Sequence, residues 1–294
     1  MTTTREAYLA ARDRLRRAGI DDANFEAELL LRHALGLGPN RAALLTRLAE
    51  LQAIEDEALV AYEALLTRRL AHEPSAYILG RREFAHFELE VTPAVLIPRP
   101  ETETVVEEAI RLARRLLSAP DRATDEGFVI ADIGTGAGPI ALTLARALPG
   151  ARVIATDVSP EALDVAQRNA TRHALDQRVA FLHGDLLAPL SQQLDLLVAN
   201  LPYVTTSDLE ALQPEVRDHE PSMALHGGAD GLELIKRLFS EANAHLRPHA
   251  ALVLEIGYDQ GETAASAAAE AFPDAQIAVL NDLAGRPRVL IIET

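Results

Sequence analysis

A glycine-rich segment exposes backbone where a ligand can approach closely. Gly134, Gly136 and Gly138 follow an apolar stretch that reads as a strand and precede a helical pattern. A glycine run alone also fits a simple tight turn, because glycine tolerates conformations that other residues avoid. The next apolar stretch ends at Asp157, where a carboxylate can bind the two hydroxyls of a ribose. Together these residues predict a site for a nucleoside-containing cofactor.

The spacing of the glycines distinguishes between two types of cofactor-binding loop. A dehydrogenase loop of the form Gly-x-Gly-x-x-Gly would need glycine where Pro139 stands. The run that starts at Asp132 instead resembles the first motif of class I S-adenosylmethionine methyltransferases. That resemblance implies that the loop holds the amino-acid end of the cofactor and that Asp157 binds its ribose. The loop residues are Gly134, Thr135, Gly136, Ala137 and Gly138.

A third strand end carries Asp185 and Leu186. The same superfamily commonly places a residue of this position against the adenine ring. Asp185 could accept a hydrogen bond from the adenine amino group, and Leu186 could pack against the ring. Taken alone, Asp185 fits a turn at a strand end equally well. Three strand ends in register favour the cofactor interpretation.

A fourth apolar stretch ends in Asn200-Leu201-Pro202-Tyr203. In a doubly wound sheet this end faces the cofactor crevice. The tetrapeptide resembles the Asn/Asp-Pro-Pro-Tyr/Phe signature of methyltransferases that act on planar nitrogen, in glutamine amides or in exocyclic amines of adenine and cytosine. Leu201 departs from the commoner proline, and an Asn-Leu-Pro-Tyr version also resembles ribosomal-RNA adenine dimethyltransferases. The predicted catalytic residues are Asn200, Leu201, Pro202 and Tyr203, and Asn200 is also predicted to bind the cofactor.

These four residues suit a reaction that depends on orientation. An amide nitrogen is a poor nucleophile because its lone pair is delocalised, and the sequence offers no strong base near the motif. The side-chain oxygen of Asn200 can accept a hydrogen bond from one N–H of the substrate amide, and the Leu201 carbonyl can accept one from the other N–H. Tyr203 can stack on the amide plane. Alignment of reactants can lower a barrier by roughly 7–11 kcal/mol.

The composition excludes several other kinds of site. The chain has a formal net charge of −16, so we expect no stable binding of nucleic acid, which depends on clustered cations. The sequence has no cysteine, which excludes disulfides, thiolate zinc sites and a cysteine nucleophile. Residues 218–220 read Asp-His-Glu without the spacing of a metal site, and we predict no metal.

We expect a monomeric cytoplasmic protein. The first residues lack the apolar stretch of a secretory signal. An apolar run of roughly 18 residues, as needed to cross a bilayer, is also missing from the sequence.

The order of elements predicts how these residues are positioned. Helical spacing over residues 1–74 predicts a small bundle that Pro74 ends, and partial alternation over 75–98 predicts a strand-rich, hairpin connector. A polar linker is expected at 118–127. Within 99–294, alternating strands and helices predict an α/β, doubly wound, mainly parallel sheet with helices on both faces. The strands are expected at 128–133, 153–156, 179–182, 194–199, 251–256 and 289–292.

Several segments resemble the bacterial HemK/PrmC family, the release-factor glutamine methyltransferases. The resemblance covers essentially the whole chain, and its most specific part is the Ile-Pro-Arg-Pro-Glu-Thr-Glu stretch at 97–103. Its other segments lie at 73–74, 77–80, 83–84, 220–221, 224–225, 227–232 and 254–257. It implies a seven-stranded Rossmann-like methyltransferase sheet, with residues 1–74 as a substrate-recognition domain and residues 99–294 as the methyltransferase domain.

The resemblance also implies the reaction. S-adenosyl-L-methionine would methylate the N5 nitrogen of the glutamine in the Gly-Gly-Gln motif of peptide-chain release factors, leaving S-adenosyl-L-homocysteine. A sibling family that methylates a ribosomal-protein glutamine typically has Pro-Arg-Ser where this chain has Pro100 after Arg99, which favours the release-factor branch. The alternatives are the ribosomal-protein glutamine and an exocyclic adenine nitrogen of a flipped base in nucleic acid.

Overall fold

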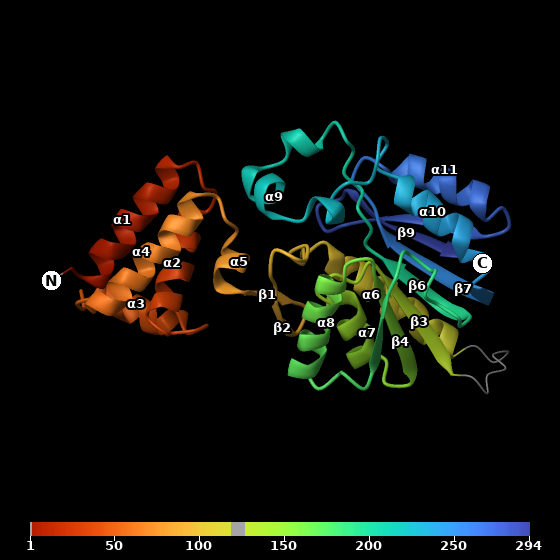
Figure 1. Cartoon of the computed structure of the whole chain (residues 1–294), viewed down its shortest axis with the longest axis horizontal. Coiled ribbons are helices and arrows are strands. Elements are labelled where there is room, and N and C mark those ends of the chain that lie inside the picture. Colours follow the sequence, from red (N-terminus) through yellow and green to blue (C-terminus); the bar gives the residue numbers. More distant parts are fainter. Residues whose placement is uncertain (1, 119–126) are drawn as a thin grey trace. The chain divides into compact units, whose positions relative to one another are not determined.

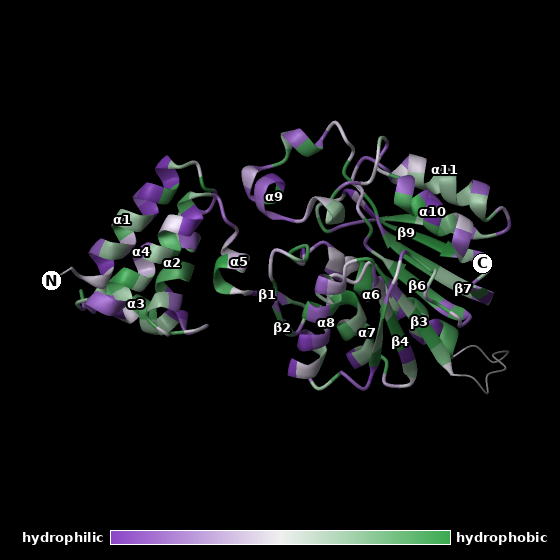
Figure 2. Ribbon diagram, in the orientation of Figure 1, coloured by the Kyte–Doolittle hydropathy of each residue, from purple (hydrophilic) through white to green (hydrophobic). Residues whose placement is uncertain are grey.

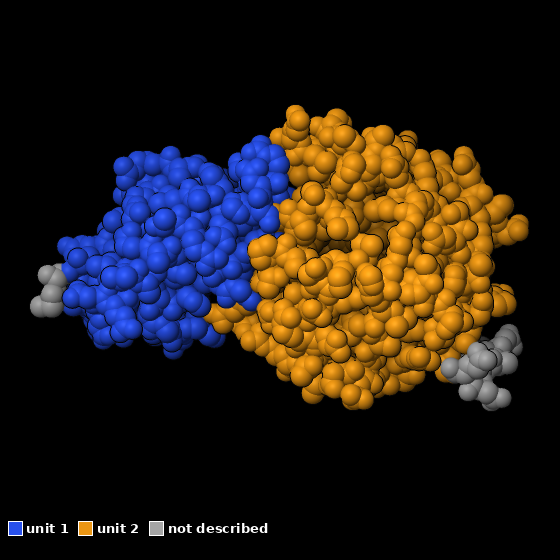
Figure 3. Space-filling model, in the orientation of Figure 1, with its two compact units in different colours: residues 1–80, 213–219 blue, residues 81–212, 220–294 orange. Residues whose placement is uncertain are grey.

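Two compact units make up the described part of the chain (Figure 3). The structure is a computed structural model, and it describes residues 2–118 and 127–294. One unit comprises Met1–Gly80 with Gln213–His219, and the other comprises Arg81–Leu212 with Glu220–Thr294. Residues 119–126 of the expected polar linker lie outside the described residues.

The first unit is helical and has a core of its own. Helix α1 begins with a capping box, in which Thr3 and Glu6 each bind the backbone N–H of the other. The buried Tyr62 hydroxyl donates to the carbonyl of Ala27 over 2.9 Å, so burying this polar group leaves its hydrogen bond satisfied. The helices of this unit are α1 Thr4–Arg17, α2 Ala23–Ala34, α3 Arg41–Ala49, α4 Asp56–Leu70, α5 Ser75–Leu79 and α9 Pro214–His219.

Helix α9 belongs to the helical unit although it is far away in sequence. The Arg69 guanidinium, whose side chain is 2% exposed, lies 2.5 Å from Glu215 and 3.2 Å from Glu26. Burial raises the pKa of Glu26, and the charge of Arg69 opposes that rise. Pairing compensates the cost of burying the guanidinium. The segment that follows Tyr203 therefore passes through the helical unit before it returns at Glu220.

Residues 75–98, expected to be strand-rich, contain strands only in part. The structure has a helix at Ser75–Leu79, because Pro74 begins it and Gly80, with φ of 69°, ends it in the left-handed region. The antiparallel hairpin β1 Arg81–Phe84 and β2 Phe87–Glu90 follows. Prolines 93 and 98 then interrupt regular pairing, because proline cannot donate a backbone hydrogen bond.

The predicted doubly wound, mainly parallel α/β sheet is confirmed. In the described part of the chain the main sheet has seven strands in the order β5-β4-β3-β6-β7-β9-β8, and β9 runs antiparallel to both of its neighbours, β7 and β8. The sequence patterns predict no strand at 276–281, where the structure has a half-buried strand with alternating burial at the edge of the sheet. The strands are β3 Phe128–Ile133, β4 Ala151–Asp157, β5 Val179–His183, β6 Leu194–Ala199, β7 Leu246–Glu255, β8 Gln276–Asn281 and β9 Pro287–Glu293.

Helices cover both faces of the sheet (Figure 1). Successive strand residues point to opposite faces. Ile130 accordingly joins the core formed with α6 and α7, and Ala131 joins the core formed with α10 and α11. Both of these residues are buried, and the central strands consist mostly of apolar residues (Figure 2). The helices are α6 Thr102–Leu117, α7 Pro139–Ala147, α8 Pro160–Arg172, α10 Glu233–Ala242 and α11 Gly261–Ala271, with short 3₁₀ turns η1 Leu209–Ala211 and η2 Ser222–Ala224.

Candidate functional site

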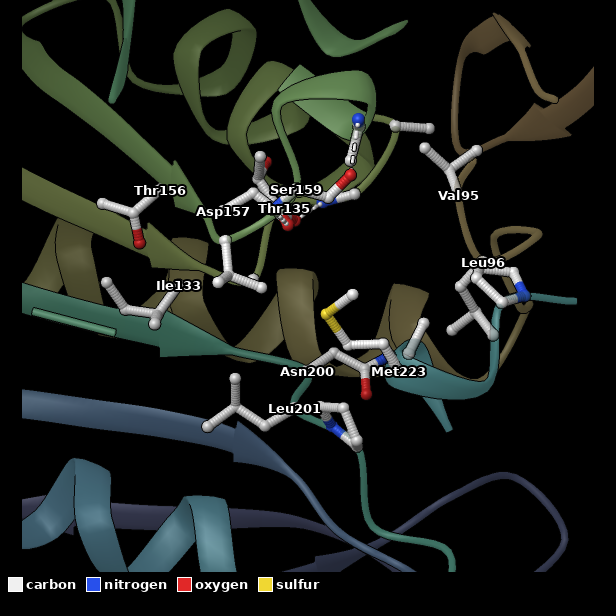
Figure 4. Close-up of a pocket in the computed structure, with 18 of the residues that line it drawn as sticks. Val95, Leu96, Ile133, Thr135, Thr156, Asp157, Ser159, Asn200, Leu201 and Met223 are labelled. Atoms are coloured by element: carbon white, nitrogen blue, oxygen red, sulfur yellow. Dashed lines mark hydrogen bonds between the residues drawn. The ribbon is translucent and has the colours of Figure 1, made fainter. Parts of the chain in front are cut away.

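The carboxyl ends of four parallel strands open into one cavity. Ile133 on β3 pairs with Thr156 on β4 and with Ala199 on β6, and Asp157 pairs with His183 on β5. This register brings together the loops that follow these strands. They border a cavity of about 450 Å³, shown in Figure 4. The predicted site residues that line it are Gly134, Thr135, Gly136, Ala137, Asp157, Asp185, Leu186, Asn200, Leu201 and Pro202.

The glycine loop is held against β4 by backbone hydrogen bonds. The N–H groups of Gly134 and Thr135 both donate to the carbonyl of Thr156, each over 2.9 Å. A Cβ on Gly134 would lie 3.1 Å from a methyl of Leu201, at a backbone φ of 74°. Only glycine suits this position, because the loop and the tetrapeptide are in contact. Gly138 does not line the cavity, and a Cβ at this position would meet Leu142 and Ala166.

Asp157 is tied to the glycine loop by its carboxylate. One oxygen accepts from the N–H of Gly136 over 2.8 Å, and the other accepts from the N–H of Ser159 over 2.9 Å. Burial raises the pKa of Asp157, while these backbone donors oppose the rise. Each carboxylate oxygen can accept a second hydrogen bond, so the side chain retains capacity for ligand hydroxyls.

Asp132 lies fully buried beneath the loop. One oxygen accepts from the Thr135 hydroxyl over 2.6 Å and from the N–H of Ala141 over 3.0 Å, and the other has no partner. Burial raises the pKa of Asp132 to about 7 from an ordinary value of 3.8. An uncompensated buried carboxylate favours its neutral form.

Asp132 should therefore make folding depend on pH. The folded chain keeps this proton up to about pH 7, whereas the unfolded chain releases it near pH 4, so the contribution to stability is lost as the pH rises between these values. The loss amounts to roughly 4 kcal/mol at most. Denaturant unfolding at pH 4 to 8 should show this decline in wild type relative to Asp132→Asn. Parallel pH curves for the two proteins would contradict the assignment.

Asp185 and Leu186 lie at the end of β5 with different surroundings. Leu186 is buried, and its carbonyl accepts from the Thr156 hydroxyl over 3.1 Å. Asp185 is exposed and forms an ion pair of 2.6 Å with Arg237 on α10. An exposed pair of this kind contributes little stability, so the carboxylate can exchange partners at little cost.

Three of the four tetrapeptide residues line the cavity, and Tyr203 does not. The Tyr203 hydroxyl donates to Glu255 over 3.2 Å, and its carbonyl accepts from Gln260 over 3.0 Å. Burial raises the pKa of the Tyr203 hydroxyl, so this group stays protonated at neutral pH. Tyr203 is thus held by Glu255 and Gln260, which do not line the cavity.

Two residues that the sequence patterns do not predict support the tetrapeptide. Thr102 donates to Glu255 over 2.6 Å and accepts from the Asn200 side-chain amide over 3.2 Å. Burial raises the pKa of Glu255, and the hydrogen bond from Thr102 opposes that rise. Both residues stand in segments that carry the family resemblance, at 97–103 and 254–257. Spacing gave no reason to place either residue beside Asn200.

The segment 227–232 packs on the tetrapeptide. A Cβ on Gly227 would lie 2.6 Å from the Pro202 carbonyl oxygen. The backbone of Val204 donates to Leu225 and accepts from Gly227. The glycines therefore allow close packing of backbone on backbone, in addition to forming the turn before α10.

Arg99 lines the cavity and forms an ion pair with Glu220. The Glu220 side chain is 1% exposed and pairs with Arg99, and it also accepts from the N–H of Ile97 over 3.1 Å. Arg99 is the one basic side chain among the described residues that line the cavity. The neighbouring Asp218 pairs with Arg217. Within residues 2–118 and 127–294 no group of His, Asp or Glu is arranged to hold a metal ion.

Both units match known protein families. The family described as PrmC N-terminal domain matches residues 6–80, and the family described as Methyltransferase small domain matches residues 109–215. Among solved structures, the hMettl16 catalytic domain in complex with MAT2A 3'UTR hairpin 1 is 15% identical, with a TM-score of 0.53 over 82% of each chain. A likeness at this identity shows the fold alone.

Relatives of much higher identity span nearly the whole chain. A release factor glutamine methyltransferase of Moorella thermoacetica is 44% identical over 290 residues, which cover 98% of this chain and 98% of that protein. One of Geobacter sulfurreducens is 43% identical over 262 residues, which cover 89% of this chain and 86% of that protein. On this identity and coverage, the chain belongs to the family of release factor glutamine methyltransferases.

Proposed function

We propose that this protein transfers a methyl group from S-adenosyl-L-methionine to the N5 amide nitrogen of the glutamine in the Gly-Gly-Gln motif of peptide-chain release factors. The observation that carries the proposal is the single cavity that the glycine loop and Asn200 share, in a chain with full-length relatives of this activity. A planar acceptor nitrogen and a methyl donor can meet only where these two elements meet.

The cavity fits the cofactor. Its volume of about 450 Å³ lies within the range of small-molecule sites. The glycine loop would hold the amino-acid end, Asp157 the ribose, and Asp185 with Leu186 the adenine. When bound, S-adenosyl-L-methionine supplies an electrophilic methyl group on a sulfonium centre. A backbone cradle at a helix N-terminus and a buried carboxylate suit the two polar parts of such a molecule.

The protein's own part in the reaction is to orient the acceptor. The Asn200 amide nitrogen is engaged by Thr102, so its oxygen is left to accept one substrate N–H. The Leu201 carbonyl would accept the other. The substrate nitrogen loses one proton as it gains the methyl group, and a methylated amide nitrogen is acidic enough to release that proton to water. Alignment therefore replaces a general base.

Asp157 gives a direct test of the cofactor site. Asp157→Ala should weaken cofactor binding by roughly 10- to 100-fold, because it removes a charged hydrogen-bond acceptor. Its effect on kcat at saturating cofactor should be much smaller. Calorimetry with S-adenosyl-L-homocysteine measures the binding, and the exposed Asp176→Ala serves as control. Unchanged affinity with a large loss of kcat would reverse the roles given to Asp157 and Asn200.

We infer the following organisation of the protein. Residues 1–74 grip the release factor, 75–98 connect, and 99–294 carry the methyltransferase reaction. The separate core of the helical unit supports its assignment as a domain of its own. In the described ranges no helix is long and apolar enough to span a membrane. The proposed protein acts as a monomer in the cytoplasm, where release factors work, and does not bind nucleic acid stably.

The substrate can be tested directly. The protein would be incubated with cofactor labelled at the methyl group and with release factor, the same factor carrying alanine at the Gly-Gly-Gln glutamine, ribosomal protein or RNA. We expect label on the unchanged release factor alone. Label on RNA or ribosomal protein in its place would transfer the assignment to one of the two alternatives.

A further inference from the structure

Two residues outside the tetrapeptide connect its two polar members. Thr102 begins α6, and Glu255 ends β7. Asn200 donates to Thr102 over 3.2 Å, Thr102 donates to Glu255 over 2.6 Å, and Tyr203 donates to the second oxygen of Glu255 over 3.2 Å. We call these four residues the Asn200 relay. It joins three segments that are far apart in sequence.

The hydrogen bonds of the Asn200 relay all run toward Glu255. The Thr102 hydroxyl donates to one oxygen of Glu255 and the Tyr203 hydroxyl donates to the other, so both oxygens of this carboxyl group act as acceptors. Because the single proton of the Thr102 hydroxyl is used in the hydrogen bond to Glu255, the Thr102 oxygen can only accept from Asn200. The Asn200 side chain must then turn its NH₂ group toward Thr102. Its oxygen is left free on the cavity side, as an acceptor for a substrate N–H.

Burial makes this direction costly to reverse. Thr102 is 3% exposed and Glu255 is 1% exposed, so water is not at hand to replace a lost partner. A flipped Asn200 would place its oxygen against a Thr102 oxygen whose proton is already used. An unsatisfied buried polar contact costs about 1–3 kcal/mol, which is enough to keep one orientation of the amide dominant.

We propose that Thr102 and Glu255 are positioning residues for methyl transfer, which set the orientation of the Asn200 amide and anchor Tyr203. The proposal rests on the function given above and goes beyond it, because neither residue need touch the substrate. It also gives a role to Thr102 in the segment at 97–103 and to Glu255 in the segment at 254–257.

Two substitutions at Thr102 provide the sharpest test. Thr102→Val keeps the shape of the side chain but removes the hydroxyl, and it should lower kcat for release factor by roughly 10- to 100-fold. Thr102→Ser restores the hydroxyl and should stay within about threefold of wild type. Affinity for S-adenosyl-L-homocysteine should change by less than about threefold in both. The control Thr4→Val removes another buried threonine hydroxyl, which donates to Gln52 over 2.9 Å in the helical unit.

Glu255→Gln tests the direction of the relay. It keeps the shape of the side chain, but it replaces one acceptor oxygen with an NH₂ group. That group must face either Thr102 or Tyr203, and both hydroxyls donate to the carboxyl group in wild type. We expect a loss of kcat similar to that of Thr102→Val, roughly 10- to 100-fold. Thermal unfolding would reveal whether Glu255→Gln impairs folding. If it does, the comparison of Thr102→Val with Thr102→Ser still tests the positioning role.

The outcomes separate this inference from the proposed function. Wild-type methylation of release factor tests the function alone. Given that activity, a Thr102→Val variant with kcat within about twofold of wild type would overturn the positioning role. Equal losses in Thr102→Val and Thr102→Ser, or a loss confined to cofactor affinity, would overturn it too.

Discussion

Asn200→Ala is expected to lower kcat by about 10²- to 10³-fold while cofactor affinity stays within about threefold of wild type. The variant removes the oxygen that accepts the substrate N–H, and it leaves the glycine loop and Asp157 in place. A contact made to the oriented acceptor affects turnover more than cofactor binding. Single-turnover kinetics with release factor and calorimetry with S-adenosyl-L-homocysteine measure the two quantities separately.

A second replacement distinguishes loss of the acceptor from loss of orientation. Asn200→Asp keeps an acceptor oxygen but cannot donate to Thr102, so it should lose turnover although an acceptor is still present. Asn243, an exposed residue that caps α10, provides the control Asn243→Ala, which should behave as wild type. If Asn200→Ala instead abolished cofactor binding and left kcat intact at saturation, the tetrapeptide would belong to the cofactor site.

Local patterns were enough to predict the strands that carry the site. An apolar run followed by glycine or by Asp157 identifies a strand end, and parallel strands bring such ends to one edge. The structure places the glycine loop and Asn200 around one cavity. The family resemblance added the identity of the substrate, which residue spacing could not supply.

Contacts between distant segments could not be predicted in this way. Thr102 and Glu255 are 153 residues apart, and Arg69 and Glu215 are 146 apart. A threonine at a helix start and a glutamate at a strand end have ordinary local roles, so their types reveal no partnership. The same holds for Tyr203, whose ring was expected beside the substrate and whose hydroxyl is held by Glu255.

Gly231→Ala is expected to lower kcat by at least about 100-fold, because it displaces the end of the tetrapeptide. A Cβ at this position would lie 2.3 Å from the Tyr203 carbonyl oxygen and 2.4 Å from the Gln260 side-chain nitrogen. The Gln260 side chain can rotate away, but the carbonyl belongs to the backbone. Relief of the collision requires a shift of about 1 Å at Tyr203, a displacement that can cost 10²-fold in rate.

Gly285 provides a matched control for this substitution. Its φ of 78° is close to the 73° of Gly231, yet a Cβ there would meet nothing within 4 Å. Both alanine variants therefore incur the same conformational penalty of about 1 kcal/mol, and only Gly231→Ala adds the collision. Steady-state kinetics should show Gly285→Ala within about twofold of wild type. Equal activity of the two variants would mean that the backbone of 227–232 does not hold Tyr203 in place, and the support of the tetrapeptide would then rest on Glu255 and Gln260.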